Sequence, residues 1–167
     1  MKHIFWLFIV LVLPLRAQFS SATIGINGLT CSACAKGVEL RVRKLPFVDS
    51  VAMNLKQTEA KIFFKKNTKI EIAKLAKAVV DAGFSVRSLQ IGFKFNKVDI
   101  TDNYCFTFEG NNYQFLKTGN KNLNGNVVLK LVGQDYLTKT DLASWKPLLK
   151  NVCGTTDKKV KTYFVTL

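Results

Sequence analysis

The stretch Gly28-Leu29-Thr30-Cys31-Ser32-Ala33-Cys34 places two thiols three residues apart. An alternating segment at residues 23–26 precedes it, and a run with helical spacing begins near Ser32. A loop that turns into a helix start can aim both sulfurs at one soft cation, and the free N–H groups of that helix start favour the thiolate, which is the metal-binding form. Cys-x-x-Cys also occurs in redox disulfides and as half of a zinc knuckle, so the surrounding sequence has to decide between them.

In residues 22–91 the spacing of the apolar residues alternates between the period of two typical of strands and the longer period typical of helices. Apolar residues at Cys34, Val38, Val42 and Leu45 form one face of a helix and turn Cys34 toward the core, while Cys31 stays in the loop. Thr68 and Glu71 have the spacing of a capping box that opens a second helix, and Gly83 ends it. With strands before, between and after the helices, the predicted order is βαββαβ, in which two helices cover one face of a four-stranded sheet.

This segment resembles a heavy-metal-associated domain, the module of copper chaperones, of the amino-termini of metal-pumping ATPases and of periplasmic mercury-binding proteins. The family signature Gly-Met-Thr-Cys-x-x-Cys appears at residues 28–34, and the later Ala-Gly-aromatic sequence appears at residues 82–84. Leu29 replaces the family's methionine, which mostly packs under the loop, and Phe47 stands where a glycine is usual. The resemblance covers about 70 residues and implies an α+β, ferredoxin-like sandwich.

The resemblance also implies the chemistry of the site. Cys31 and Cys34 would be the ligands of a single two-coordinate soft ion, with Cu(I) as the first choice and Hg(II) or another soft heavy metal as the second. Thr30, before the first cysteine, is similar to the copper and mercury members, whereas zinc and cadmium members tend to carry aspartate there. Phe84 would lie near the site and shield it, although a role as a core aromatic is the stronger expectation.

The first 17 residues have the layout of a secretory signal peptide. A basic start is followed by an apolar run over residues 4–15, too short for a membrane-spanning helix, and small residues follow it. Cleavage after Ala17, or less favourably after Ala22, predicts an exported protein, periplasmic or secreted, with no transmembrane segment in the mature chain. An uncleaved membrane anchor is the weaker alternative.

The mature chain is strongly basic. Without Lys2 and Arg16, 23 of the 25 basic residues remain against 11 acidic ones, a net charge of +12. Export argues against nucleic acid as the binding partner. The charge therefore predicts binding to an anionic envelope surface or to an acidic partner, such as a metal donor or acceptor. Lys36, beside the cysteine loop, is the first candidate for partner docking. A soluble, solvated surface with no specific partner is an equal alternative.

Residues 92–167 predict a small, mostly β domain of no family that the sequence identifies. A hairpin is expected across the turn at residues 109–112, a loop over 118–126, a strand over 127–132, a short helix over 140–149 and a final strand over 160–165. The alternating aromatic residues predict a core and not a binding platform. The only histidine is His3, in the leader, so no Ser/His/Asp set is available, and the sequence does not indicate an enzyme.

Two cysteines remain after the metal pair is assigned. Cys105 and Cys153 lie in the same predicted domain of an exported chain, and we expect them to form a disulfide. The rival hypothesis is a second thiol pair that receives the ion from Cys31 and Cys34.

These observations favour a non-catalytic exported protein that captures or hands on Cu(I). Three alternatives stay open: a scavenger of Hg(II) or another heavy metal, a thiol-disulfide oxidoreductase, and an adaptor whose C-terminal domain binds the partner that receives the metal. Against the oxidoreductase, residues 22–91 lack the tryptophan and the late proline loop of thioredoxin-like chains.

Overall fold

The N-terminal half alternates strands and helices in the predicted order. In the computed structural model, which describes residues 19–154 and 159–167, this half comprises β1 (Phe19–Asn27), α1 (Ser32–Arg43), β2 (Val48–Asn54), β3 (Glu59–Phe64) and α2 (Ile72–Asp81), and it ends in β4 (Ser85–Ile100). The predicted signal peptide at residues 1–17 lies outside the described residues.

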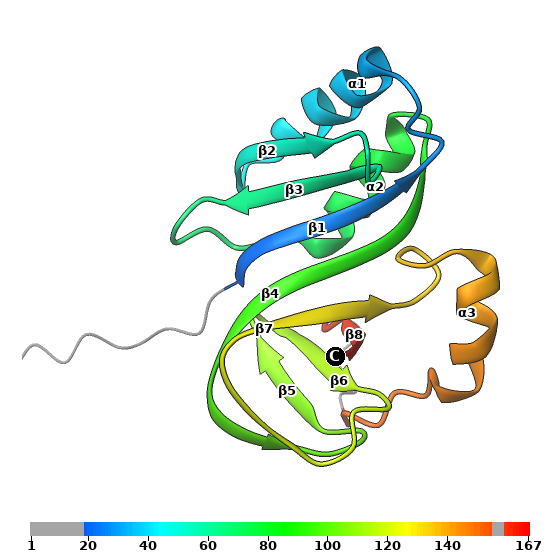
Figure 1. The fold of residues 1–167 in the computed structure, drawn as a ribbon. Coiled ribbons are helices and arrows are strands. Elements are labelled where there is room, and N and C mark those ends of the chain that lie inside the picture. The colour runs from blue at the N-terminus through cyan, green and yellow to red at the C-terminus, as the bar shows by residue number, and fades with distance from the viewer. Residues whose placement is uncertain (1–18, 155–158) are drawn as a thin grey trace, which may run out of the picture.

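Both helices of this half lie on one face of the sheet (Figure 1). The strand order in this part is β2-β3-β1-β4, and each neighbouring pair is antiparallel. Ile24 and Ile26 of β1 and Val38 of α1 are fully buried, because alternating strand residues and the helix stripe face each other across one core. The ferredoxin-like α+β prediction for this segment is therefore confirmed.

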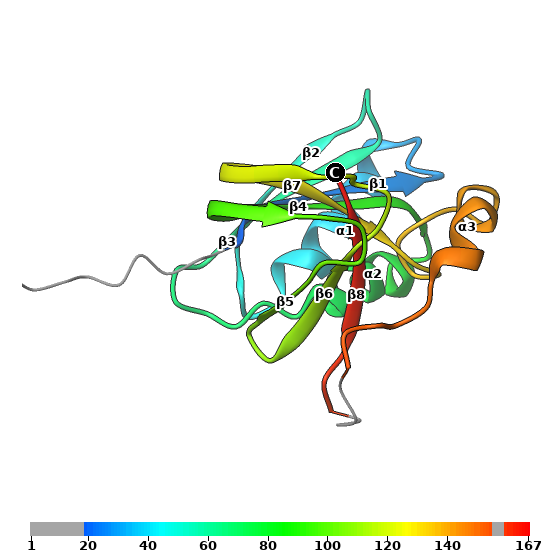
Figure 2. The same ribbon diagram turned by 90° about the horizontal axis from the view of Figure 1, so that it is seen from below.

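The C-terminal half continues the same sheet. It adds β5 (Cys105–Phe108), β6 (Asn111–Phe115), β7 (Lys121–Val132), α3 (Lys139–Trp145), a 3-10 turn at Lys146–Leu148 and β8 (Thr162–Thr166). The full order is β2-β3-β1-β4-β7-β8-β6-β5, with β4 running through both halves (Figures 1 and 2). The predicted boundary at residues 91 and 92 thus lies inside one uninterrupted strand. None of the helices in the described part of the chain is long and apolar enough to cross a membrane.

Aromatic rings join the two halves. The ring of Phe19, at the start of β1, is 2% exposed and packs edge-on against Phe93 of β4, Phe108 of β5 and Tyr113 of β6. Such edge-to-face contacts stabilise a core beyond the area that they bury. The aromatic alternation of the C-terminal half forms core, as its pattern predicted.

One predicted loop is a strand. The composition of residues 118–126 predicts a loop, but β7 already begins at Lys121 and pairs with β4 as far as Ile100. Leu123 is the buried apolar residue of this run, and Gly125, with φ of 77°, lies opposite Phe95, next to the register shift in β4. Pairing with an existing strand thus overrides the turn-like composition.

The predicted capping box is also wrong. The Thr68 hydroxyl donates to the Lys65 carbonyl, and the Glu71 carboxylate binds the Lys74 ammonium at 2.7 Å, so neither side chain caps α2. The segment that leads into α2 is bound by a residue of the C-terminal half. The Ile70 N–H donates to Glu109 Oε2, in the turn between β5 and β6, at 2.9 Å. The partner comes from 39 residues away in sequence, beyond the range of a local motif.

This contact yields a stability prediction. Replacing Glu109 by alanine leaves the partly buried Ile70 N–H without its acceptor, and we expect the free energy of unfolding to fall by about 1–2 kcal/mol. Glu71→Ala is the matched control, because it removes only an exposed ion pair and should cost clearly less. Denaturant unfolding of both variants measures the difference, and equal losses would show that Glu109 does not hold α2.

Candidate metal centre

The cysteine loop connects β1 to α1. Gly28 has φ of 79°, a conformation that glycine adopts without strain, and it turns the chain out of the strand. Leu29 is 1% exposed, so it packs beneath the loop, the place expected for the family's methionine. This buried anchor holds the two cysteines at the end of the sheet, where α1 begins.

The helix start holds the first sulfur. Cys31 is the N-cap of α1, and its Sγ accepts a hydrogen bond from the Cys34 N–H at 3.0 Å. The Cα atoms of the two cysteines lie 5.1 Å apart, and their sulfurs are joined in a disulfide. Cys31 is exposed, whereas Cys34 is half-buried and packs against the core, in the arrangement that the helix stripe predicted.

Reduction of this disulfide would free two sulfur atoms of a kind that binds soft metal ions. Two electrons and two protons from a dithiol reductant would convert it to two thiols, and the helix N-terminus favours their ionisation. In the described part of the chain, no group of three or more His, Cys, Asp or Glu residues could hold a metal ion. The pair therefore offers two sulfur ligands, which suit a soft ion of low coordination number and not a hard cation.

Two further predicted residues lie around the loop. Phe84 is half-buried and packs against the core, and a Cβ placed on Gly28 would lie 3.8 Å from its ring, so the ring borders the loop. Lys36, on the first turns of α1, is exposed and pairs with Glu39 at 3.2 Å. Glu39 also binds Arg43 at 2.7 Å, and the hydrogen bonds from Arg43 and Lys36 hold the pKa of the Glu39 carboxyl below its ordinary value. Lys36 is thus already partly neutralised.

Comparison with known proteins agrees with this geometry. Residues 23–85 match the model of the heavy-metal-associated domain. The mercuric transport protein periplasmic component of Shigella flexneri is 34% identical over 73 residues, which are 44% of this chain and 79% of that protein. The chain belongs to the heavy-metal-associated domain family. The family match covers a segment only, and residues 86–167 lie outside it.

The relatives of this heavy-metal-associated domain are named for different metals. A probable copper-transporting ATPase of Arabidopsis thaliana is 30% identical over 71 residues, 42% of this chain but only 7% of the ATPase. The crystal structure of oxidised MerP from Ralstonia metallidurans CH34 is 33% identical, covers 42% of this chain and 97% of that one, and has a TM-score of 0.37. The family match and the curated relatives support heavy-metal binding by the domain and leave the ion to be assigned.

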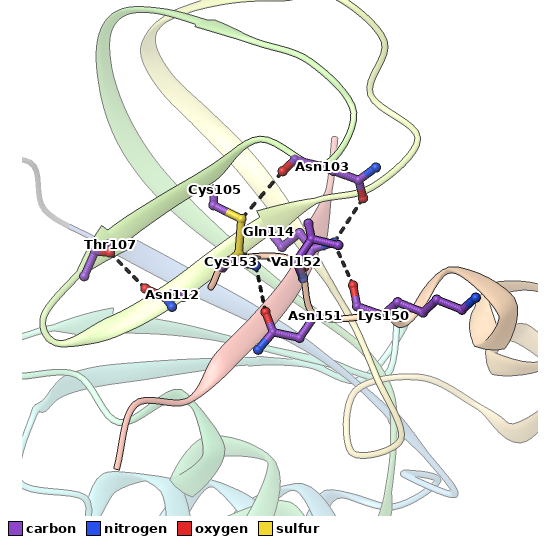
Figure 3. Close-up of a disulfide and its surroundings, with 9 residues drawn as sticks. All are labelled: Asn103, Cys105, Thr107, Asn112, Gln114, Lys150, Asn151, Val152 and Cys153. Carbon is purple, nitrogen blue, oxygen red and sulfur yellow. Dashed lines mark hydrogen bonds between the residues drawn. A yellow bond between two sulfur atoms is a disulfide. The ribbon is translucent and has the colours of Figure 1, made fainter. Parts of the chain in front are cut away.

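The second cysteine pair lies in the C-terminal half (Figure 3). Cys105, at the start of β5, and Cys153, after the 3-10 turn, are joined in a disulfide with Cα atoms 5.7 Å apart. That distance is within the range for an unstrained bridge. In the structure, the two sulfurs are bonded to each other and not free as thiols.

A buried glutamine beside this disulfide was missed by the sequence analysis. The Gln114 amide is fully buried, and its Nε2 donates to Asn103 Oδ1 and to the Lys150 carbonyl, each at 3.0 Å (Figure 3). Its Oε1 accepts from the Val152 N–H at 3.1 Å. Alternation along β6 places Gln114 on the face opposite Tyr113 and Phe115, so the local pattern predicts an exposed residue and carries no signal of its burial.

Proposed function

We propose that this protein is an exported, non-catalytic carrier that captures or hands on one soft metal ion, Cu(I) first, through Cys31 and Cys34. The observation that carries the proposal is the pair of cysteines at the start of α1, with the Cys34 N–H bonded to the Cys31 sulfur and no third ligand grouped with them among the described residues. Two thiolates on one side of a helix start match a two-coordinate ion that must also be released.

Hg(II) is the second candidate ion. It accepts the same two-thiolate geometry, and the relative from Shigella flexneri, of which this chain covers 79%, is named a mercuric transport protein. The ATPase relatives of Arabidopsis thaliana and Rhizobium meliloti are named for copper. Cys31 and Cys34 offer the same two sulfur ligands to Cu(I) and to Hg(II). Measured affinities are therefore needed to decide between the two ions.

We expect the reduced protein to bind one Cu(I) per chain. Metal analysis after anaerobic reduction and desalting gives the stoichiometry, and competition with a chromophoric Cu(I) chelator gives the affinity. The same titration with Hg(II) tests the second ion. Absence of bound Cu(I) together with retention of one Hg(II) would transfer the assignment to mercury, and absence of both would contradict the proposed function.

Export and partner contact complete the proposal. Cleavage after Ala17 would leave all of β1 in place, whereas cleavage after Ala22 would remove Phe19, whose ring packs in the core, so the structure supports the earlier site. The partner would be a metal donor or acceptor that meets the exposed cysteine loop, with Lys36 at its edge. In the adaptor version of this proposal, residues 92–167 form a domain that binds the partner and brings it to the loop.

A thiol-disulfide oxidoreductase is the competing function. One observation favours it: Cys31 and Cys34 are joined in the structure, and Cys31 is the more exposed of the two, as the attacking thiol of such enzymes must be. The activity assay described with the cysteine variants below separates this function from metal carriage.

A further inference from the structure

Exposed lysines gather at the end of the molecule opposite the cysteine loop. Lys65, Lys66 and Lys69 lie in the connection from β3 to α2, which Figure 1 shows at the left, with the loop from β1 to α1 at the right. Lys161 precedes β8 and lies at the same end, because its carbonyl accepts from Asn112 N–H in the hairpin whose turn holds Ile70. We call these four residues the lysine pole.

Within residues 19–154 and 159–167, no ion pair includes a lysine of the lysine pole. The basic members of the ion pairs there are Lys36, Arg43, Lys74, Lys77 and Arg87. Among the described residues, the nearby carboxylates are those of Asp49, which is exposed, of Glu71, which pairs with Lys74, and of Glu109, which accepts from the Ile70 N–H. Asp49 and Glu109 keep their negative charge and offset part of the charge of the four lysines. The pole therefore keeps an excess of positive charge, whereas four of the five ion pairs lie on α1 or α2.

An exposed aromatic ring lies beside the pole. Phe63, two residues before Lys65, is 39% exposed, and the Lys61 ammonium lies 5.4 Å from the centre of its ring. Phe63 pairs with Ser21 in β1, so the chain also enters the fold at this end. An aromatic ring among lysines is the combination that sits at the boundary between lipid headgroups and acyl chains.

We propose that the lysine pole and Phe63 bind an anionic phospholipid surface. Each lysine near such a surface adds to the attraction, and an interfacial ring adds apolar burial. Because the pole and the cysteine loop lie at opposite ends of β1 and β3, binding would turn Cys31 and Cys34 away from the membrane, where a soluble donor or acceptor can reach them. The inference does not depend on which metal the cysteines carry.

Vesicle flotation tests this proposal. The chain without residues 1–17, which keeps all described residues, is mixed with vesicles of equal parts phosphatidylglycerol and phosphatidylcholine, or of phosphatidylcholine alone. We expect flotation with the first vesicles only, and its loss in 0.5 M salt. Lys65→Glu, Lys66→Glu and Lys69→Glu together should weaken partitioning at low salt by at least about 100-fold. Phe63→Ser should also weaken partitioning at low salt, by a smaller factor, because it removes only the apolar contribution.

A matched variant separates a local surface from overall charge. Lys56→Glu, Lys139→Glu and Lys146→Glu together change the net charge by the same amount at exposed positions outside the pole. We expect this variant to float like the parent, with Cu(I) affinity unchanged in both triple variants and folding checked by circular dichroism. Equal loss in the two triple variants would overturn the lysine pole as a specific surface, and so would absence of flotation by the parent protein.

Discussion

Replacing both Cys31 and Cys34 by serine should lower the Cu(I) affinity of the reduced protein by more than about 1,000-fold. A serine hydroxyl stays protonated at neutral pH and is a hard oxygen ligand, so it replaces neither the charge nor the softness of a thiolate. The fold should persist, since Cys31 is exposed and Cys34 is only half-buried. Competition with a chromophoric Cu(I) chelator measures the affinity, and circular dichroism checks the fold.

The control for this variant is the other cysteine pair. Cys105→Ser and Cys153→Ser together should leave the Cu(I) affinity unchanged, because these residues lie in the C-terminal half and not in the cysteine loop between β1 and α1. Full retention of Cu(I) by the Cys31→Ser, Cys34→Ser variant would contradict the site. In an insulin-reduction assay the parent should show little turnover beside a thioredoxin-type control. Fast turnover that is lost in the same variant would establish the oxidoreductase instead.

The candidate site could be predicted because its determinants are local. The glycine turn, the two cysteines and the helix that starts between them span only a few residues, and helical spacing alone placed Cys34 inward and Cys31 outward. The burial of Leu29 was implied by the family resemblance, in which the methionine at this place mostly packs under the loop. The βαββαβ order was predictable for the same local reason as the site, because it follows from the spacing of apolar residues inside each helix and strand.

The sequence failed where a partner from far along the chain decides the structure. Glu109 holds the entry to α2, so Thr68 and Glu71 were free to make other contacts. Residues 121–126 are polar and contain glycine, yet they become a strand because β4 offers an edge to pair with. The extent of β4 itself, through the predicted boundary at residues 91 and 92, depends on the same pairing.

The Cys105–Cys153 disulfide should make the largest single contribution to the stability of the C-terminal half. It joins residues 48 apart, and in the chain-entropy model a loop of that length stabilises the fold by about 4 kcal/mol. Cys105→Ser and Cys153→Ser together should therefore lower the unfolding temperature by roughly 10 °C, measured by calorimetry under non-reducing conditions. Cys31→Ser and Cys34→Ser together, which open a loop of separation 3, should have a clearly smaller effect.

The effect should also be localised beside Gln114. Without the bridge, residues 150–153 are held by the hydrogen bonds of the buried Gln114 amide. The Val152 N–H, which donates to Gln114 Oε1, should therefore exchange faster with solvent. Hydrogen exchange of the variant tests this, with the Ile70 N–H, bound to Glu109, as an internal reference that should stay protected.

Mass spectrometry of the non-reduced parent must find the bridge. Free thiols at both positions, or a variant that unfolds at the parent's temperature, would contradict the stabilising role, because a closed loop cannot be opened without enlarging the unfolded ensemble.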